Sequence, residues 1–324
     1  MARIVGDLVP EDDYTHPLGP EPHWNESMYF NFFDRTRRVG GFVRLGNRAN
    51  EGRAEMTATL YLPDAGVLFG FARPPIAGND AFDAGGMRFD VLEPAQRLRT
   101  TFAGEVLELR EPRVMADPKR AFAESPRRRL ALDLEHVAVG PMYGGHADRE
   151  EGEREPEKQF AKAHYEQHMA VACELVIDGE ETRIEGFGLR DHSWGPRYWQ
   201  AIHSYEWLTL NFGRDFGAMV SIIRRDASSE RIGGVVVRGD ALDPVRSARV
   251  SAEYEPGSLH HTGVRASVET AGGERLEITG KVVGYVPLRN RRGGSLTHIG
   301  EGMTEWRCGG RVGYGLSEFL RQVQ

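Results

Sequence analysis

Short runs of alternating apolar and polar residues follow one another along most of the chain. Residues 55–62 alternate and end in the turn sequence Pro-Asp-Ala-Gly, after which residues 67–72 have the character of a hairpin partner. The remaining runs of this kind in the first half are 87–92, 98–102, 105–110 and 130–139. The first fifty residues are unusually aromatic, and we predict an irregular segment there.

The second half continues in the same manner. Glycine-containing sequences, Asp178-Gly179 and Ala271-Gly272-Gly273, lie where hairpin turns are needed, because glycine adopts a positive φ without a Cβ clash. The strands expected in this half are 169–177, 181–189, 203–211, 217–223, 232–238, 246–254, 264–269, 276–283 and 310–318. Only two short helices are expected, at 118–124 and 158–167. Strands at this spacing without long amphipathic helices indicate an all-β protein of antiparallel barrels or sandwiches.

The length of 324 residues fits two consecutive β units, which we place at 1–180 and 181–324. With 40% hydrophobic and 27% charged residues, the composition is that of a globular protein, and the 39 glycines suit many tight turns. The acidic run at 148–157 is expected to be a solvated loop without chemistry.

The composition also limits which binding partners and which cellular compartment we expect. A net charge of −7 argues against a nucleic-acid partner. No stretch approaches the ~20 apolar residues of a membrane-spanning helix, and the N-terminus lacks an apolar signal region, so we expect a cytoplasmic protein. Cys173 and Cys308 are expected to be buried reduced thiols. A homo-oligomer is left open.

The densest group of chemically capable side chains lies in the string GFGLRDHSWGPRYW, which begins at Gly186. We expect a rigid loop or strand exit here. Neighbouring side chains on an extended backbone point to opposite faces, so Asp191 and His192 are not expected to pair. In one interpretation Asp191 donates a proton into an aromatic pocket formed with Trp194 and Trp199, whose apolar wall would raise its pKa.

The alternative for the same string is structural. Asp191 could instead meet Arg190 or Arg197 through a turn and act as a brace that fixes the loop. Composition alone favours the brace, because structural ion pairs are common.

The string Asp-His-Ser-Trp-Gly at 191–195 resembles that of the superfamily that contains carotenoid 1,2-hydratases (hydroxyneurosporene synthases), AttH-type proteins and fungal pericyclases. The likeness is closest to its uncharacterised bacterial two-domain members, with which the chain also shares Trp-Asn-Glu-Ser at 24–27 and His-Tyr-Glu-Gln at 164–167. The resemblance implies two consecutive lipocalin-like β-barrels, with the motif near their junction. It is less specific for the reaction, because activities differ across this superfamily.

The two shorter motifs add further candidates. In a strand, Tyr165 would share one face with Gln167 while His164 and Glu166 share the other, and Tyr165 or Glu166 could orient a substrate oxygen or relay a proton. The alternative is a brace at the junction of the two units. The resemblance favours the site.

Near the N-terminus, Glu26 with Trp24 and Tyr29 suits a pocket that stabilises a carbocation, because negative charge and π faces both attract positive charge. A core strand with outward polar residues is the alternative. Trp207 lies in a strand-like context and is a further candidate for substrate binding.

A second group of acids comprises Glu301, Glu305 and Glu318, of which the first two could converge with His298 on one barrel mouth. Structural carboxylates are the alternative. No metal site is expected, because His260-His261 has no third ligand at a suitable spacing. Nucleophile-elbow and phosphate-binding loop sequences are absent.

Our hypothesis is a cofactor-independent hydratase or dehydratase that performs acid–base chemistry on an isoprenoid or other lipophilic alkene, with a hydrophobic small molecule as its partner. Asp191 would supply or relay the proton, and Arg197 would belong to the substrate pocket. The rival hypotheses are a cofactor-free terpenoid or polyene cyclase or pericyclase, and a lipophile carrier without catalysis. None of these needs a cofactor.

Overall fold

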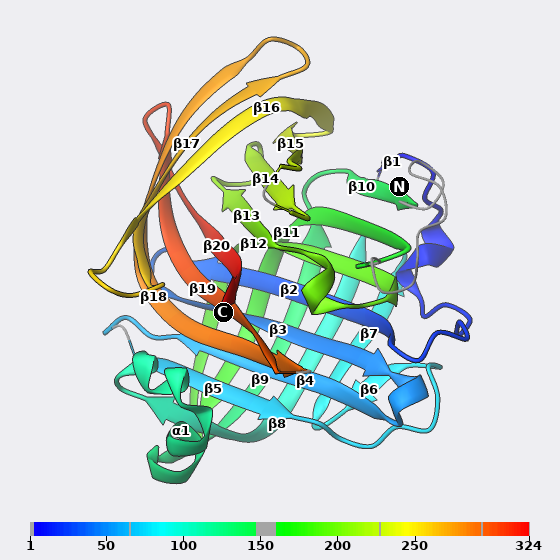
Figure 1. Cartoon of the computed structure of the whole chain (residues 1–324), viewed down its shortest axis with the longest axis vertical. Coiled ribbons are helices and arrows are strands. Elements are labelled where there is room, and N and C mark those ends of the chain that lie inside the picture. The colour runs from blue at the N-terminus through cyan, green and yellow to red at the C-terminus, as the bar shows by residue number, and fades with distance from the viewer. Residues whose placement is uncertain (1–2, 65, 147–159, 227, 293, 324) are drawn as a thin grey trace.

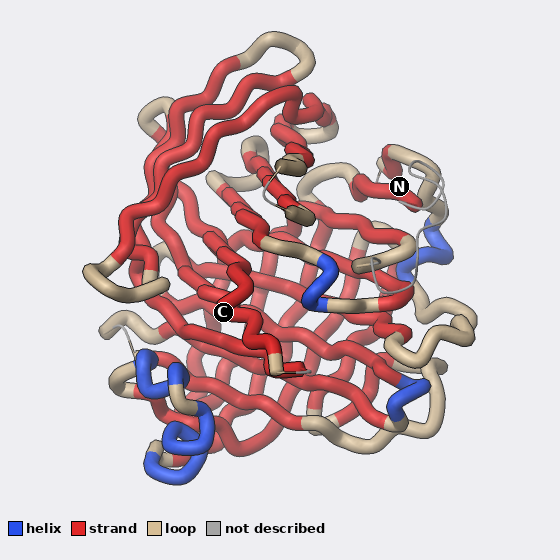
Figure 2. Tube along the Cα trace, in the orientation of Figure 1, coloured by secondary structure: helices blue, strands red, loops and turns tan. Residues whose placement is uncertain are grey.

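The computed structural model describes residues 3–64, 66–146, 160–226, 228–292 and 294–323. Strands dominate it (Figure 2), and α1 (Pro118–Glu124) is the one α-helix within these ranges. Short 3₁₀ turns accompany it at η1 (Pro10–Asp13), η2 (Ala49–Glu51), η3 (Pro112–Ala116) and η5 (Trp199–Ala201). The acidic run at 148–157 lies outside the described residues.

The N-terminal part forms a large sheet in the order β1-β10-β11-β12-β2-β3-β4-β5-β8-β7-β6. Strand β9 pairs with both β11 and β8, and these pairings close β11, β12, β2, β3, β4, β5, β8 and β9 into a ring. The bounds are β1 (Ile4–Val5), β2 (Trp24–Asp34), β3 (Val39–Arg48), β4 (Arg53–Tyr61), β5 (Val67–Ala72), β6 (Phe82–Ala84), β7 (Met87–Glu93), β8 (Arg97–Leu109), β9 (Arg127–Ala138), β10 (Met142–His146), β11 (Ala163–Ile177) and β12 (Glu180–Pro196).

The C-terminal part is a closed antiparallel barrel, β13 to β20 in sequence order. In Figure 1 its long strands β16, β17 and β18 rise beyond the first sheet, while β18 and β19 curve back across it. The bounds are β13 (Ser204–Asn211), β14 (Gly217–Arg224), β15 (Arg231–Arg238), β16 (Ala241–Tyr254), β17 (His261–Thr270), β18 (Arg275–Arg292), β19 (Ser295–Cys308) and β20 (Arg311–Val323). The predicted all-β architecture of two consecutive barrels is confirmed.

Local sequence explains the long hairpin that carries most of the candidate residues. Strands β11 and β12 are joined by Asp178 (φ 52°) and Gly179 (φ 93°). Two successive residues with positive φ make the tight turn whose twist matches that of the flanking strands, and Asp-Gly is a favoured sequence for it. The hairpin is in register from Ile177–Glu180 to Ala163–Trp194, so the two motifs lie side by side.

Three predictions of local structure were wrong. The first fifty residues contain β2 and β3 instead of an irregular segment; every residue of β2 is buried, so its two faces show no contrast in polarity. A helix was expected at 158–167, but the described residues from Ala163 onward belong to β11, whose polar side chains on both faces hide the alternation. The string from Gly186 continues as strand to Pro196.

Each barrel has its own apolar core, and the two pack through the opposite faces of their strands. Met28 and Phe30 lie in the core of the first barrel, and Val220 and Trp306 in that of the second. A third cluster, which includes Tyr29, Phe33, Phe42, Val286, Met303 and Leu316, joins outward-facing side chains of both.

The strands change from one sheet to the other between Pro196 and Ser204. We therefore propose this segment as the boundary between the units, where the sequence suggested residue 180. No helix among the described residues has the length and apolar character needed to span a membrane.

Candidate active site

A cavity of about 1340 Å³ lies between the two barrels. Its first wall comes from the outward faces of β2, β3, β11 and β12, and its second wall from β13, β14, β19 and β20. The strand faces that line the cavity are opposite to those that carry the two barrel cores, since Tyr29 and Met219 line it while Phe30 and Val220 are core residues.

Alternation along β11 and β12 divides the predicted catalytic residues into two sets. Asp191 and Glu166 line the cavity, together with His164. Tyr165 and His192 are fully buried on the other face. The prediction that Asp191 and His192 would not pair is confirmed, because their side chains have separate partners.

The cavity set is a compact trio. Asp191 lies directly opposite Glu166 in the strand register, and His164 lies two residues before Glu166 on the same face. The His164 Nε2 atom is hydrogen-bonded to Asp191 Oδ2 and lies 3.6 Å from Glu166 Oε1. The indole Nε1–H of Trp207, from the second barrel, donates to Glu166 Oε1 at 2.7 Å. All three members of the trio therefore belong to the first barrel, and the second barrel contacts it through Trp207.

Burial and charge tune the trio for proton transfer at neutral pH. Burial raises the pKa of Glu166 to about 7, although the neighbouring His164 charge acts to lower it. Burial acts to lower the pKa of His164, but the Asp191 carboxylate outweighs this effect and raises that pKa to about 9. A carboxyl group whose pKa is near 7 can both give and accept a proton, as general acid–base catalysis requires.

Aromatic rings surround the trio. Tyr29, Trp199 and Trp207, predicted as substrate contacts, all line the cavity. The rings of Tyr29 and Trp207 meet edge to face with centroids 5.5 Å apart. These surfaces suit an apolar substrate and present π faces to positive charge that develops near Glu166.

Asp191 does not form an ion pair with Arg197. Arg197 lines the cavity, as predicted, and its Nη2 donates to Ser193 Oγ at 2.7 Å. Gly195 shapes this strand exit: its φ is 120°, and a Cβ there would lie 2.5 Å from the Lys162 nitrogen.

A second pair of carboxyl groups lies on the wall formed by the second barrel. Glu301 and Glu318 are directly opposite each other in the β19–β20 register, and both line the cavity. Burial raises the pKa of each to about 8, and Asp191 contributes to the rise at Glu318. The Tyr205 hydroxyl donates to Glu318. Sequence reasoning considered these acids secondary and did not find Tyr205, whose position depends on packing between the barrels.

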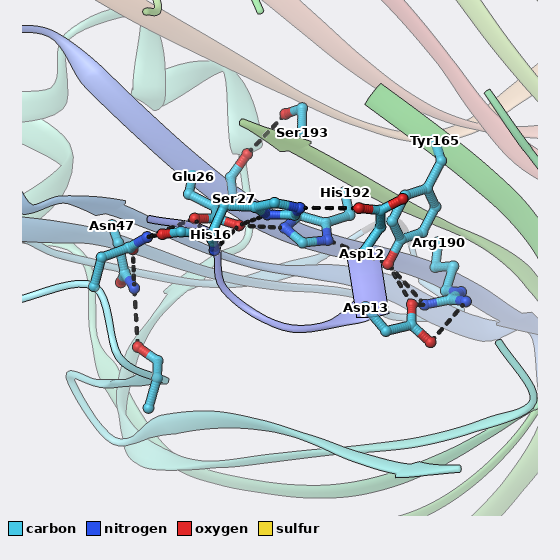
Figure 3. A network of polar contacts seen from close by, with 12 residues as sticks. Asp12, Asp13, His16, Glu26, Ser27, Asn47, Tyr165, Arg190, His192 and Ser193 are labelled. Atoms are coloured by element: carbon cyan, nitrogen blue, oxygen red, sulfur yellow. Dashed lines mark hydrogen bonds and ion pairs between the residues drawn. The ribbon is translucent and has the colours of Figure 1, made fainter. Parts of the chain in front are cut away.

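The other face of β11 and β12 carries a buried network of hydrogen bonds and ion pairs, most of which Figure 3 shows. Arg190 is buried and donates to Asp13 Oδ1 at 2.5 Å, and Tyr165 donates to the same oxygen at 2.5 Å. His192 lies 3.0 Å from Glu26 Oε1 through Nε2 and 3.2 Å from the Tyr165 hydroxyl through Nδ1.

The N-terminal segment completes this network. His16 Nδ1 lies 2.6 Å from Glu26 Oε1, and the His16 ring stacks on Trp194 at 3.7 Å. Burial acts to raise the pKa of Glu26, but hydrogen bonds from His16 and His192 outweigh it and lower that pKa to about 2. Trp24 and Trp194 pack together in a separate buried cluster.

Five predicted site residues therefore lie away from the cavity. They belong to the face with the paired network and are Trp24, Glu26, Tyr165, His192 and Trp194. Alternation within the motifs puts them there, and we assign them a bracing role instead of one in the candidate active site.

Residues 9–323 match the family described as a domain of unknown function, DUF7064. The chain belongs to this family. No curated protein matches its sequence.

Three solved structures share the fold of this DUF7064 protein. A protein assigned as AttH from Nitrosomonas europaea is 15% identical, covers 99% of this chain and 98% of its own, and has a TM-score of 0.60. CghA with Sch210972 is 13% identical, with coverage of 93% and 89% and a TM-score of 0.56. Kievitone hydratase from Nectria haematococca is 10% identical, with coverage of 92% and 88% and a TM-score of 0.54. The predicted resemblance to the superfamily of AttH-type proteins and hydratases is confirmed at the level of fold.

Two trios in the described part of the DUF7064 chain bring potential metal ligands within 4.8 Å of one another: His16 with Glu26 and His192, and His164 with Glu166 and Asp191. A tetrahedral zinc lies ~2.0–2.1 Å from its ligands and keeps them more than about 3 Å apart. The 2.6 Å contact between His16 and Glu26 is shorter, so a metal ion would have to separate these groups. The geometry is that of hydrogen-bonded pairs.

Proposed function

We propose that the protein is a cofactor-independent hydratase or dehydratase that acts on a lipophilic alkene in the cavity between the barrels. The main support for this proposal is the trio of His164, Glu166 and Asp191, which lies in a wall otherwise rich in aromatic rings. Kievitone hydratase has the same fold at 10% identity, which is compatible with this proposal and carries none of its residue roles.

The proton that starts the reaction comes from Glu166. Its carboxyl group, with a pKa raised to about 7 by burial, gives the proton to one alkene carbon and leaves a cation on the other. The π faces of Tyr29 and Trp207 stabilise that positive charge, and the carboxylate of Glu166 remains beside it.

Water then forms the new C–O bond and gives a proton to Asp191. His164 Nε2 contacts Asp191 and lies 3.6 Å from Glu166, so one imidazole connects the accepting and the donating carboxyl groups. The net reaction adds water to an alkene, nothing is oxidised or reduced, and dehydration is the same path reversed. General acid–base assistance contributes ~10²–10⁴-fold, and exclusion of bulk water and pocket electrostatics supply the rest.

A cofactor-free cyclase is the second candidate, favoured by the size of the cavity, which could fold a long polyene beside the same acid. A carrier would use only the apolar walls. The three functions predict different product masses: one water more or less for a hydratase or dehydratase, the substrate mass for a cyclase, and an unchanged compound for a carrier.

The test is incubation of the wild-type protein with pools of isoprenoid and polyene metabolites, followed by untargeted mass spectrometry. The matched variant is Asp191→Asn, with Glu174→Gln as a control at an exposed position of the same hairpin. We expect a mass change of one water with the wild type and the control, and none with Asp191→Asn, which should still bind the substrate. Full turnover by Asp191→Asn would refute the role given to Asp191.

A further inference from the structure

Among the residues that line the cavity are two guanidinium groups with no carboxylate partner in the described part of the chain. Arg44 of β3 and Arg197, which follows β12, both line it. Within the described ranges of the chain, no carboxylate oxygen lies within 4.0 Å of a side-chain nitrogen of either residue. Arg197 is only 9% exposed, and its Nε atom has no hydrogen-bond partner among the described residues. Arg190, on the other face, is by contrast paired with Asp13.

The acids nearest to these groups are committed elsewhere or carry a proton. Glu55, close enough for its charge to affect Arg44, is 3.3 Å from Arg73, and Asp191 is bonded to His164. Burial raises the pKa of Glu301 and of Glu318 to about 8, so both are largely uncharged at neutral pH. The cavity therefore holds an excess of positive charge.

This excess of positive charge makes a cavity that is empty, or filled only by an apolar ligand, energetically unfavourable. Burial and, next to it, the charge of Arg44 lower the pKa of Arg197 to about 9. A desolvated charge without a counter-ion is costly, and a bound anion would remove that cost. The Arg197 guanidinium lies over the Phe160 ring at 4.1 Å and the Trp199 ring at 5.6 Å, which fixes its plane beside the apolar walls.

We propose that the substrate is an anionic lipophile whose carboxylate binds Arg197 and Arg44 while its apolar body lies against the aromatic wall. Both guanidinium groups line the cavity, and a carboxylate accepts strong charge-assisted hydrogen bonds from such N–H donors. The proposal rests on the cavity being the substrate site, and it sharpens the expectation of a simple hydrophobic ligand to one with a charged end.

The test compares cis-parinaric acid, a fluorescent polyene carboxylic acid, with its methyl ester in fluorescence titrations at neutral pH. We expect the wild type to bind the acid at least about tenfold more tightly than the ester, as expected for a hydrogen bond to a charged group. Arg197→Gln and Arg44→Gln should each lower the ratio of acid affinity to ester affinity toward one. Arg183→Gln, at an exposed position of β12, should change neither.

Equal affinity of the wild type for acid and ester would overturn the proposal, as would failure of the acid to bind up to its solubility limit. Retained preference for the acid in both Arg197→Gln and Arg44→Gln would also overturn it. Two variants are used so that the test remains possible if one of them fails to fold. The titration needs no turnover, so its outcome does not depend on whether the protein hydrates the probe. Absence of hydration activity and absence of a preference for the acid over the ester are thus separate results.

Discussion

The two faces of the β11–β12 hairpin carry similar residues in opposite electrostatic conditions. On the face toward the first barrel, the buried ions Arg190 and Asp13 compensate each other, and Glu26 is held ionised by two histidines. On the cavity face, Glu166 is buried without a full counter-ion, and its pKa rises to about 7. Paired buried charges brace a fold, whereas a buried acid with a raised pKa is a source of protons.

Adjacent residues on β11 provide the strongest test of this contrast. We expect Glu166→Gln to lower kcat/KM by ~10²–10⁴-fold, because it removes the proton donor. The free energy of unfolding should change little, because Gln keeps an oxygen acceptor for Trp207 and the ion pair lost with His164 spans 3.6 Å. Tyr165→Phe should instead cost about 1–3 kcal/mol of stability, since Asp13 and His192 lose a buried partner, and leave kcat/KM within about twofold. Steady-state kinetics and urea unfolding measure both quantities. Equal losses of activity in the two variants would contradict the division of roles.

The buried ion pair between Arg190 and Asp13 should be the part of the network on which stability depends most. Arg190→Met leaves the Asp13 carboxylate buried with only hydrogen-bond donors, and we expect the free energy of unfolding to fall by about 3–5 kcal/mol. The exposed Arg183→Gln on the same strand should change it by less than about 0.5 kcal/mol. Replacing both partners, Arg190→Met with Asp13→Leu, should recover most of the loss. A single-variant effect as small as the control's would mean that the pair is not a brace.

Alternation within a motif could be predicted from the sequence, because it depends only on neighbouring residues. It correctly separated Asp191 from His192, and His164 and Glu166 from Tyr165. It could not show which face of the hairpin would line the cavity. It therefore could not decide whether Asp191 is a proton donor or a structural ion-pair partner. That choice depends on which face meets the second barrel.

Contacts between residues that lie far apart in the chain could not be predicted from the sequence. Asp13 reaches Arg190 across 177 positions, and nothing in the N-terminal segment signals it. Arg44 looks like any polar residue of a strand, and only the approach of β19 and β20 encloses it with Glu301. Barrel closure through β9 likewise depends on pairings that no local pattern records.

The pH dependence of stability should have opposite signs for Glu26, in the paired network, and for Glu301, in the cavity. Glu26, with its pKa lowered from 4.5 to about 2, stabilises the fold above about pH 4.5, by roughly 3 kcal/mol, and loses this as the pH falls toward 2. Glu301, with its pKa raised to about 8, favours the fold below about pH 4.5 and loses this, by up to about 1.4 kcal/mol per unit, as the pH rises to 8.

Urea unfolding between about pH 3 and pH 8 measures this difference. Glu26→Gln should be less stable than the wild type at neutral pH, with the gap closing in acid. Glu301→Gln should gain on the wild type as the pH rises from about 5 to 8. The same direction of change in both variants would show that the two acids are in similar environments, which would contradict the contrast between the paired network and the cavity.

The smallest expected effect concerns the hydrogen bond that Trp207 of the second barrel donates to Glu166. Trp207→Phe keeps an aromatic face but removes the indole N–H that donates to Glu166 at 2.7 Å and helps to lower its pKa. Losing about 1 kcal/mol of preference for the ionised form should move the pKa of Glu166 upward by less than about one unit, and the corresponding limb of the pH profile of kcat/KM should move with it. Trp199→Phe alters a cavity ring whose indole donates to no acid among the described residues, and it should leave that limb in place. A limb that stays fixed in Trp207→Phe would mean that the group titrating during turnover is not Glu166, and the proton donor would then have to be sought on the opposite wall, at Glu301 or Glu318.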